Sequence, residues 1–281
     1  MPALAPDPLR WADLGLQPGF DLGPFTLRYY ALAYILGIFL GYWHLLRMVR
    51  SPGSPLTRDQ ADDLVLWATI GIVVGGRVGY ATFYERDLWR TGEVLQVWNG
   101  GMSFHGGLIG VLVVAVVLAW RNGMSLLRLG DYVVVNVPFG MMFGRIANFI
   151  NGELWGRPSD APWAMVFPGA GDQPRHPSQL YEAALEGALM IVVMLVVFWR
   201  TSARWRPGLL AGIFFAGIGL ARFVVEFFRE PDAQLADFAE RTGLNMGQWL
   251  TLPLIALGIF LIVRALRRPA LDREPVPQPD I

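Results

Sequence analysis

Residues 144–157 read GRIANFINGELWGR, and they end a strongly apolar segment with a cluster of polar side chains. If the helix that begins near Asp131 continues through this stretch, Arg145, Asn148 and Gly152 fall on one face, because residues three or four apart are neighbours on a helix. An arginine at membrane depth costs about 2.5–3.5 kcal/mol, so it usually faces a protein interior and needs a partner. Two interpretations of Arg145 stay open: it binds an anion, or it caps the last carbonyl groups of its own helix.

The composition is that of a membrane protein. Of the 281 residues, 54% are hydrophobic and only 16% are charged, against roughly 25% charged residues in soluble domains. The formal net charge is zero and no lysine is present, so nothing indicates a nucleic-acid partner. Cysteine is absent, which excludes a disulfide framework, a thiolate nucleophile and a cysteine-based metal site. Any thiol in the chemistry must come from a partner molecule.

Seven segments are long and apolar enough to cross about 30 Å of hydrocarbon. They predict an all-α integral membrane protein with one polytopic domain over residues 1–281. The predicted spans are residues 28–48, 62–83, 104–120, 130–150, 180–199, 208–228 and 248–266.

The arginines predict the orientation, because cytoplasmic connections carry an excess of basic residues. Twelve arginines lie at or after the ends of the first, third, fifth and seventh segments, and seven lie on the opposite side, in the N-terminal stretch and the other connections. This places the C-terminus in the cytoplasm and the N-terminus outside. The outer connection of residues 151–177 is rich in proline and is expected to form a small irregular cap. The tail of residues 269–281 is rich in proline and charge, and is expected to be disordered.

Unusual polar residues converge on the outer ends of the predicted helices. Arg222, Glu226 and Arg229 stand at i, i+4 and i+7, which puts them on one helix face. They form either a structural ion-pair ladder or part of an anion site. An anion site is favoured by an excess of positive charge among the polar residues at the outer helix ends, and arginine suits bidentate phosphate binding. The residues counted are Arg77, Arg145, Arg222 and Arg229 against Glu153 and Glu226.

Two histidines lie at the same outer level. His105 follows Ser103, a predicted N-cap residue, and a helix N-terminus favours the neutral imidazole. His105 is therefore either a proton acceptor or a residue packed in a glycine-rich turn and satisfied by backbone groups. His176 precedes Pro177 and is interpreted as structural. No recognisable ligand spacing is present, so neither a metal site nor a cofactor is predicted.

Four motifs in order resemble the prolipoprotein diacylglyceryl transferase family. They are GRIANFINGELWG at 144–156, SFHGG at 103–107, HPSQLYE at 176–182 and RFVVEFFR at 222–229. The resemblance implies an enzyme of the bacterial inner (cytoplasmic) membrane, with seven spans and a small periplasmic head. It implies transfer of the diacylglyceryl group of phosphatidylglycerol to the lipobox cysteine thiol in the signal peptide of a prolipoprotein, forming a thioether and releasing glycerol phosphate. This is the first step of lipoprotein maturation.

The resemblance also implies a set of site residues. Arg145 and Arg222 are expected to grip the phosphate, and neutral His105 is expected to take the thiol proton. The substrate-binding positions implied are Tyr30, Asn148, Glu153, Gly156, Glu226 and Arg229. One departure is visible: the family often has a tyrosine where this chain has Ile218, so a hydroxyl there cannot be indispensable if the enzyme is active.

Two other functions are compatible with the sequence. One is a transporter or flippase that uses membrane-embedded arginine for an anionic solute, although such proteins commonly show internal repeats and binding sites near the midplane. The other is an unrelated phospholipid-dependent transferase that uses the same anion site with a different acceptor.

Overall fold

The computed structural model describes residues 8–23, 25–230 and 241–272 of the chain. These residues form two compact units, which are described separately below. Among the described residues, the first unit comprises 8–23, 25–43, 134–230 and 241–271, and the second comprises 44–133 and Asp272. The helix α1 (Tyr29–Val49) begins in the first unit and ends in the second.

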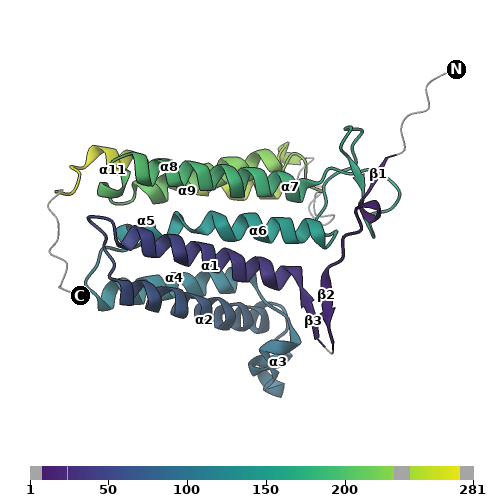
Figure 1. Cartoon of the computed structure of the whole chain (residues 1–281), viewed down its shortest axis with the longest axis horizontal. Coiled ribbons are helices and arrows are strands. Elements are labelled where there is room, and N and C mark those ends of the chain that lie inside the picture. The colour runs from purple at the N-terminus through teal and green to yellow at the C-terminus, as the bar shows by residue number, and fades with distance from the viewer. Residues whose placement is uncertain (1–7, 24, 231–240, 273–281) are drawn as a thin grey trace. The chain divides into compact units, whose positions relative to one another are not determined.

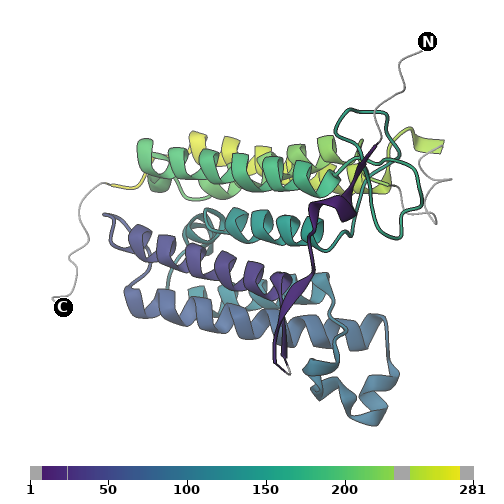
Figure 2. The same ribbon diagram turned by 45° about the vertical axis from the view of Figure 1, so that its right-hand side comes forward.

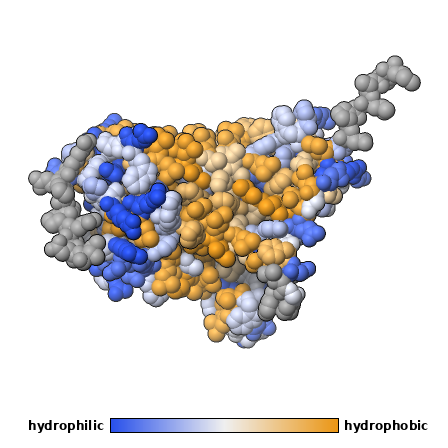
Figure 3. All heavy atoms as spheres, viewed as in Figure 1, coloured by the Kyte–Doolittle hydropathy of each residue, from blue (hydrophilic) through white to orange (hydrophobic). Residues whose placement is uncertain are grey.

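The described residues include six helices that are long and apolar enough to cross a membrane, together with the shorter apolar helix Leu209–Val225. All seven predicted segments coincide with these helices, so the predicted helical membrane fold is confirmed. Hydrophobic residues cover the middle of the helices and hydrophilic residues gather at their ends (Figure 3). This distribution is expected for helices that present their sides to lipid and their ends to water.

The first unit is built mainly from α6 (Val137–Ile150), a continuous helix over 178–200, α9 (Leu209–Val225) and α11 (Met246–Arg267). The continuous helix has α-helical ends, α7 (Ser178–Glu182) and α8 (Met190–Arg200), and a π-helical middle, η4 (Ala183–Leu189). Helices α8, α9 and α11 lie side by side in Figure 1. Glycines allow α9 and α11 to approach closely, since a Cβ on Gly212 would meet the Gly258 carbonyl oxygen at 2.9 Å.

Short strands and turns lie at the N-terminal end of α1 and beyond α6. The strands β2 (Gly19–Leu22) and β3 (Phe25–Arg28) form an antiparallel hairpin that leads directly into α1 (Figure 2). The strand β1 (Leu9–Arg10) pairs in parallel with β4 (Met165–Val166), the one named strand in residues 151–177. After β1 comes the turn η1 (Trp11–Leu14), from which the Trp11 indole N–H donates to the Phe149 carbonyl at 2.7 Å.

The second unit is organised by a pair of antiparallel helices, α2 (Arg58–Phe83) and α4 (Phe104–Arg121). Glycines line their contact, where Gly71 faces Gly110 and Gly75 faces Gly106. A Cβ on any of these four would collide with backbone of the other helix. The connection contains α3 (Asp87–Thr91), η2 (Glu93–Leu95) and η3 (Val97–Asn99), and α5 (Leu126–Val134) ends at the boundary of the unit.

Two helices end earlier than the sequence pattern predicts. Helix α6 stops at Ile150, and Gly152 adopts a left-handed conformation with φ 68°, so Gly152 does not share a helix face with Arg145 and Asn148. Helix α9 stops at Val225 instead of residue 228. Arg229 therefore lies outside the helix, where its backbone forms an antiparallel bridge with Gly156. This long-range pairing replaces the hydrogen bonds of another helical turn.

The predicted fourth span is also interrupted. Helix α5 ends at Val134 and α6 begins at Val137, with Pro138 in the first turn of α6. Proline has no backbone N–H and its ring crowds the preceding turn, so it favours a new helix start over continuation. In the predicted tail, residues 269–272 form no regular element and 273–281 lie outside the described residues.

Candidate functional site

The end of α6 positions the first part of the candidate site. Arg145 and Asn148 lie one turn apart, and the Arg145 Nη1 donates to Asn148 Oδ1 at 3.5 Å. Asn148 is buried and its Nδ2 donates to Glu153 Oε1 at 2.8 Å. The Asn151 amide donates to the same oxygen at 3.3 Å. A continuous polar chain thus leads from Glu153 through Asn148 to the Arg145 guanidinium.

The turn after α6 is held by the start of α7. The Ser178 hydroxyl donates to the Leu154 carbonyl at 3.1 Å, and the Gln179 amide donates to the Glu153 carbonyl at 2.5 Å. Ser178 and Gln179 are fully buried. Leu154 has φ 59°, a conformation that L-residues other than asparagine and aspartate rarely adopt. These contacts fix the backbone conformation that turns the Glu153 side chain back towards Asn148.

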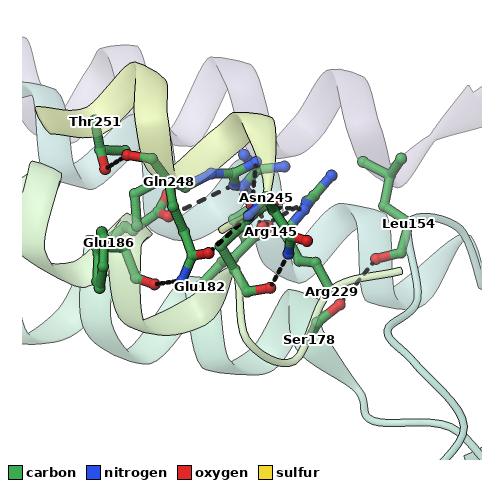
Figure 4. A network of polar contacts seen from close by, with 12 residues as sticks. Arg145, Leu154, Ser178, Glu182, Glu186, Arg229, Asn245, Gln248 and Thr251 are labelled. Atoms are coloured by element: carbon green, nitrogen blue, oxygen red, sulfur yellow. Dashed lines mark hydrogen bonds and ion pairs between the residues drawn. The ribbon is translucent and has the colours of Figure 1, made fainter. Parts of the chain in front are cut away.

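A buried carboxylate that the sequence analysis did not single out lies at the centre of the site. The Arg222 Nη1 and the Arg229 Nη1 each lie 2.7 Å from Glu182 Oε1, and the Arg145 Nε lies 2.8 Å from Oε2. The Glu182 side chain is 0% exposed, whereas the three arginine side chains are 22–27% exposed. Figure 4 shows Arg145 and Arg229 approaching Glu182 from different segments of the chain.

Two more glutamates lie beside this cluster. Glu226 Oε2 is 3.6 Å from Arg222 Nη2 and 3.5 Å from Arg229 Nε. Glu186, one turn after Glu182, has a single longer contact of 3.7 Å with Arg222. The sequence-based count of excess positive charge is therefore corrected, because Glu182 and Glu186 were left out of it. With every group ionised, the three arginines of the cluster (Arg145, Arg222 and Arg229) balance its three glutamates (Glu182, Glu186 and Glu226).

An anion can still bind, because the arginines retain free donors. In the part of the chain that the structure describes, three guanidinium nitrogens make no hydrogen bond and are not the atom of closest approach in any ion pair: Arg145 Nη2, Arg222 Nε and Arg229 Nη2. Each belongs to a guanidinium that is held on another side by Glu182. Partly exposed, pre-oriented N–H groups of this kind suit the oxygens of a phosphate.

Gly156 connects residues 151–177 to the segment that carries Arg229. Its N–H donates to the His176 carbonyl at 2.9 Å, and the next N–H, of Arg157, donates to the Phe228 carbonyl at 3.0 Å. A Cβ on Gly156 would overlap the Phe228 carbonyl oxygen and meet the His176 Cβ at 2.9 Å. The Arg157 Nε donates to the Arg229 carbonyl at 2.7 Å. Gly156 therefore has a packing role, which fixes the backbone beside the cluster.

Tyr30 belongs to the same unit, in the first turn of α1. The Tyr34 hydroxyl donates to the Tyr30 hydroxyl at 3.3 Å, and the two rings meet edge to face with centroids 5.0 Å apart. Tyr34 also interacts electrostatically with Arg145. The first unit thus contains all the predicted site residues except His105.

His105 lies in the second unit, at the second residue of α4. The predicted N-cap is confirmed: the Ser103 hydroxyl accepts from the Gly106 N–H at 3.3 Å. The His105 side chain is exposed, and among described residues its ring makes no hydrogen bond. Its ring meets that of Phe104 edge to face at 5.6 Å. The interpretation of a histidine satisfied by backbone groups is therefore not supported.

Arg77, also in the second unit, has a different environment from the cluster. Its guanidinium donates to four backbone carbonyls of the connection before α4, at distances of 2.5–3.4 Å. The residue is buried. Arg77 therefore holds this connection in place, and it is not counted among the anion-binding arginines. The carbonyls belong to Glu93, Val94, Gly100 and Gly101.

His176 packs among aromatic residues, as its structural interpretation predicted. Its Nδ1 lies 3.0 Å from the Tyr181 hydroxyl, which accepts from the Trp163 indole N–H at 2.6 Å. The ring also meets Phe228 edge to face at 5.1 Å. Burial lowers the pKa of His176 below its ordinary value. Within the described ranges, no group of three or more His, Cys, Asp or Glu is arranged to hold a metal ion.

Comparison with known proteins identifies the family. The family model of prolipoprotein diacylglyceryl transferase matches residues 18–264. The chain belongs to the prolipoprotein diacylglyceryl transferase family. The family match includes every predicted site residue and also Glu182.

Individual relatives agree with this assignment over nearly their whole length. The phosphatidylglycerol–prolipoprotein diacylglyceryl transferase of Erythrobacter litoralis is 57% identical over 265 residues, covering 94% of each chain. The protein of the same name from Zymomonas mobilis is 48% identical over 271 residues, covering 92% of this chain and 94% of its own. That from Gluconacetobacter diazotrophicus is 50% identical over 263 residues, covering 90% and 93%.

Proposed function

We propose that this chain transfers the diacylglyceryl group of phosphatidylglycerol to the cysteine thiol of a prolipoprotein. The observation that carries the proposal is the convergence of Arg145, Arg222 and Arg229 at the ends of apolar helices, each with a guanidinium nitrogen that makes no hydrogen bond to a described residue. A phospholipid presents its phosphate at this level of a membrane. Membership of the family supports the same reaction.

The arginines act on the leaving phosphate. As the bond between the glyceryl carbon and the phosphate oxygen breaks, both bonding electrons go to that oxygen and its negative charge increases. Arg145 and Arg222 bind the phosphate and stabilise this charge, the kind of preorganised electrostatic effect that is usually a large part of catalysis. Arg229 binds the same headgroup. The sulfur forms the new bond to the glyceryl carbon, which gives a thioether and glycerol phosphate.

The thiol must lose its proton before or during the attack. A free cysteine has a pKa near 8.5, so only a few per cent is thiolate at neutral pH. His105 is the proposed base, since its imidazole is exposed and no described residue hydrogen-bonds to it. Tyr30 contacts the lipid headgroup, Asn148 and Glu153 orient Arg145, and Glu226 orients Arg222 and Arg229. Gly156 keeps the neighbouring backbone in place.

The topology follows from the arginine distribution. We place the protein in the bacterial inner membrane, with the N-terminus periplasmic, the C-terminus cytoplasmic and the arginine cluster at the periplasmic face. Residues 151–177 form the periplasmic cap of a single polytopic domain. The acceptor is the lipobox cysteine of a prolipoprotein signal peptide, which reaches the same face after translocation.

Mass spectrometry of an acceptor peptide tests the proposal directly. The purified protein is incubated with phosphatidylglycerol and a lipobox peptide, beside a control peptide in which serine replaces the cysteine. We expect a diacylglyceryl mass gain on the cysteine peptide alone, with release of glycerol phosphate. Bound phosphatidylglycerol without any mass gain would contradict the proposal and favour a lipid transporter.

A further inference from the structure

We propose that Glu182 is the positioning residue of the anion site, setting the direction in which Arg145, Arg222 and Arg229 present their free N–H groups. This inference rests on the proposed function, because it assigns a role in the same transfer reaction. Glu182 itself does not touch the substrate: its side chain is 0% exposed and both carboxylate oxygens face guanidinium groups.

The geometry makes one carboxylate common to three segments of the chain. Arg145 comes from α6, Arg222 from α9 and Arg229 from the segment after α9, and each lies 2.7–2.8 Å from Glu182. The closest contact with Glu182 is made by Nε of Arg145 and by Nη1 of Arg222 and Arg229, while another nitrogen of each makes no hydrogen bond to a described residue. Since a guanidinium is planar, fixing one edge also fixes the direction of the N–H groups on the other edges.

Packing holds Glu182 itself in place. The π-helical turn η4 follows it immediately, and a Cβ on Gly187 of that turn would meet the Met142 Cβ of α6 at 2.5 Å. This close approach sets the spacing between the helix of Glu182 and the helix of Arg145. Turns of π-helix are rare and often occur at functional sites. The backbone of Glu182 thus cannot move away from Arg145 without breaking this contact.

Removing the charge of Glu182 has opposite effects on binding and on transfer. Without the carboxylate, three guanidinium groups remain close together with less negative charge between them. An anionic headgroup is then attracted at least as strongly as before. The guanidinium groups repel one another and take new directions, and an error of about 1 Å at a reacting group can cost about 100-fold in rate. The expected result is a lower kcat without a higher KM for phosphatidylglycerol.

Glu186 provides a matched control. It is buried, lies one turn away on the same helix and has the same side chain, but its one contact with an arginine is 3.7 Å long. Glu186→Gln removes the same formal charge at nearly the same place. If charge balance alone mattered, the two substitutions would have similar effects. If direct orientation matters, only Glu182→Gln lowers kcat strongly.

The experiment measures steady-state transfer to the lipobox peptide with varied phosphatidylglycerol, together with Tm in detergent. The variants are Glu182→Gln, Glu182→Asp and Glu186→Gln. We expect kcat to fall about 100-fold in Glu182→Gln, with an unchanged or lower KM, and to change less than about 5-fold in Glu186→Gln. Glu182→Asp retains the charge but is one methylene shorter. Compared with Glu182→Gln, its Tm should therefore be closer to the wild-type value than its kcat is.

The results separate this inference from the proposed function. Wild-type protein that transfers nothing contradicts the proposed function. Active wild-type protein with a near-normal kcat in Glu182→Gln overturns the inference alone. An equal loss of kcat in Glu182→Gln and Glu186→Gln also overturns the inference, because it assigns Glu182 a role in charge balance only. Full recovery of both kcat and Tm in Glu182→Asp overturns it too, because it assigns Glu182 a role in folding only.

Discussion

Arg77 and Arg222 are both arginines in a membrane protein, but their partners differ in kind. Arg77 donates to four carbonyl groups of one connection, and each of its three guanidinium nitrogens is engaged. Arg222 shares the Glu182 carboxylate with two other arginines, and its Nε has no partner among the described residues. The first arrangement completes a local backbone structure. The second leaves donors without a partner among the described residues, so the proposed difference between a structural and a substrate-binding arginine lies in the type of partner and in the donors that remain.

The substitution Arg222→Lys should have a large effect on transfer. Lysine retains the charge but loses the planar, two-sided donor geometry, so it cannot bind Glu182 and phosphate in the same way. We expect kcat/KM to fall about 100- to 1,000-fold, with little change in Tm. The measurement is peptide transfer followed by mass spectrometry. Retention of more than a tenth of wild-type activity would show that a point charge is sufficient.

Arg77→Lys is the matched control for this comparison. Lysine cannot reach all four carbonyls, and a hydrogen bond to a charged group contributes about 1.5–3 kcal/mol. We therefore expect a lower Tm, with kcat per folded molecule within about 5-fold of wild type by the same distinction between structural and substrate-binding arginines. A large loss of kcat without loss of Tm would overturn that distinction.

His105 and His176 allow the same comparison between two histidines. General-base catalysis typically contributes about 100- to 10,000-fold, so His105→Gln should lower kcat by a factor in this range. His176→Gln removes a ring packed against Tyr181 and Phe228, and it should lower Tm more than kcat. For both variants, initial transfer rates give kcat and thermal unfolding gives Tm. Full turnover by His105→Gln would exclude it as the base.

Gly156→Ala tests whether packing beside the cluster is required. The added Cβ would overlap the Phe228 carbonyl oxygen, so the backbone that carries Arg229 must shift. Overpacking typically costs about 1–3 kcal/mol, and a smaller loss of activity should accompany it. Gly144→Ala is the control, because a Cβ there meets no atom within 4 Å. Equal Tm values for the two variants would contradict this role of Gly156.

The smallest expected effect concerns the pH dependence of stability. Burial lowers the pKa of His176, so the unfolded chain binds a proton at higher pH than the folded protein does. The contribution of His176 to stability is therefore fully present above about pH 6.5 and is lost as the pH falls through the lower folded-state value. Tm should decline on acidification below pH 6.5, and less so in His176→Gln. An identical decline in both proteins would assign the effect to other groups.

Hydropathy alone predicted all seven helical segments, because a membrane-spanning helix needs a long apolar run that few other structures need. The polar ends of those segments also indicated Arg145, Asn148, Arg222 and Glu226 as neighbours of a common site. Their roles in the reaction remain predictions. The helix ends were less predictable: Arg229 leaves the helical path because its backbone pairs with Gly156, a contact between residues far apart in sequence.

Glu182 was missed for a different reason. It belongs to a motif that carries the family resemblance, but the predicted charge balance of the site included Glu153 and not Glu182. Glu153 accepts hydrogen bonds from Asn148 and Asn151 and, among the described residues, forms no ion pair with an arginine. A carboxylate in an apolar span is itself a signal of function or pairing. By this signal, Glu182 and Glu186 can be recognised from the sequence as candidate site residues, because both lie in the predicted span 180–199. Sequence could not show that one carboxylate serves three arginines.

The glycine contact between α2 and α4 has a mechanical consequence. Side chains normally form a deformable layer between two helices, but here the backbones meet directly at Gly71, Gly75, Gly106 and Gly110. With no such layer, one helix cannot slide past the other without collision. Arg77 on α2 and His105 on α4 therefore lie on two helices whose backbones are in direct contact, and the position of one helix along the other is fixed at these four glycines.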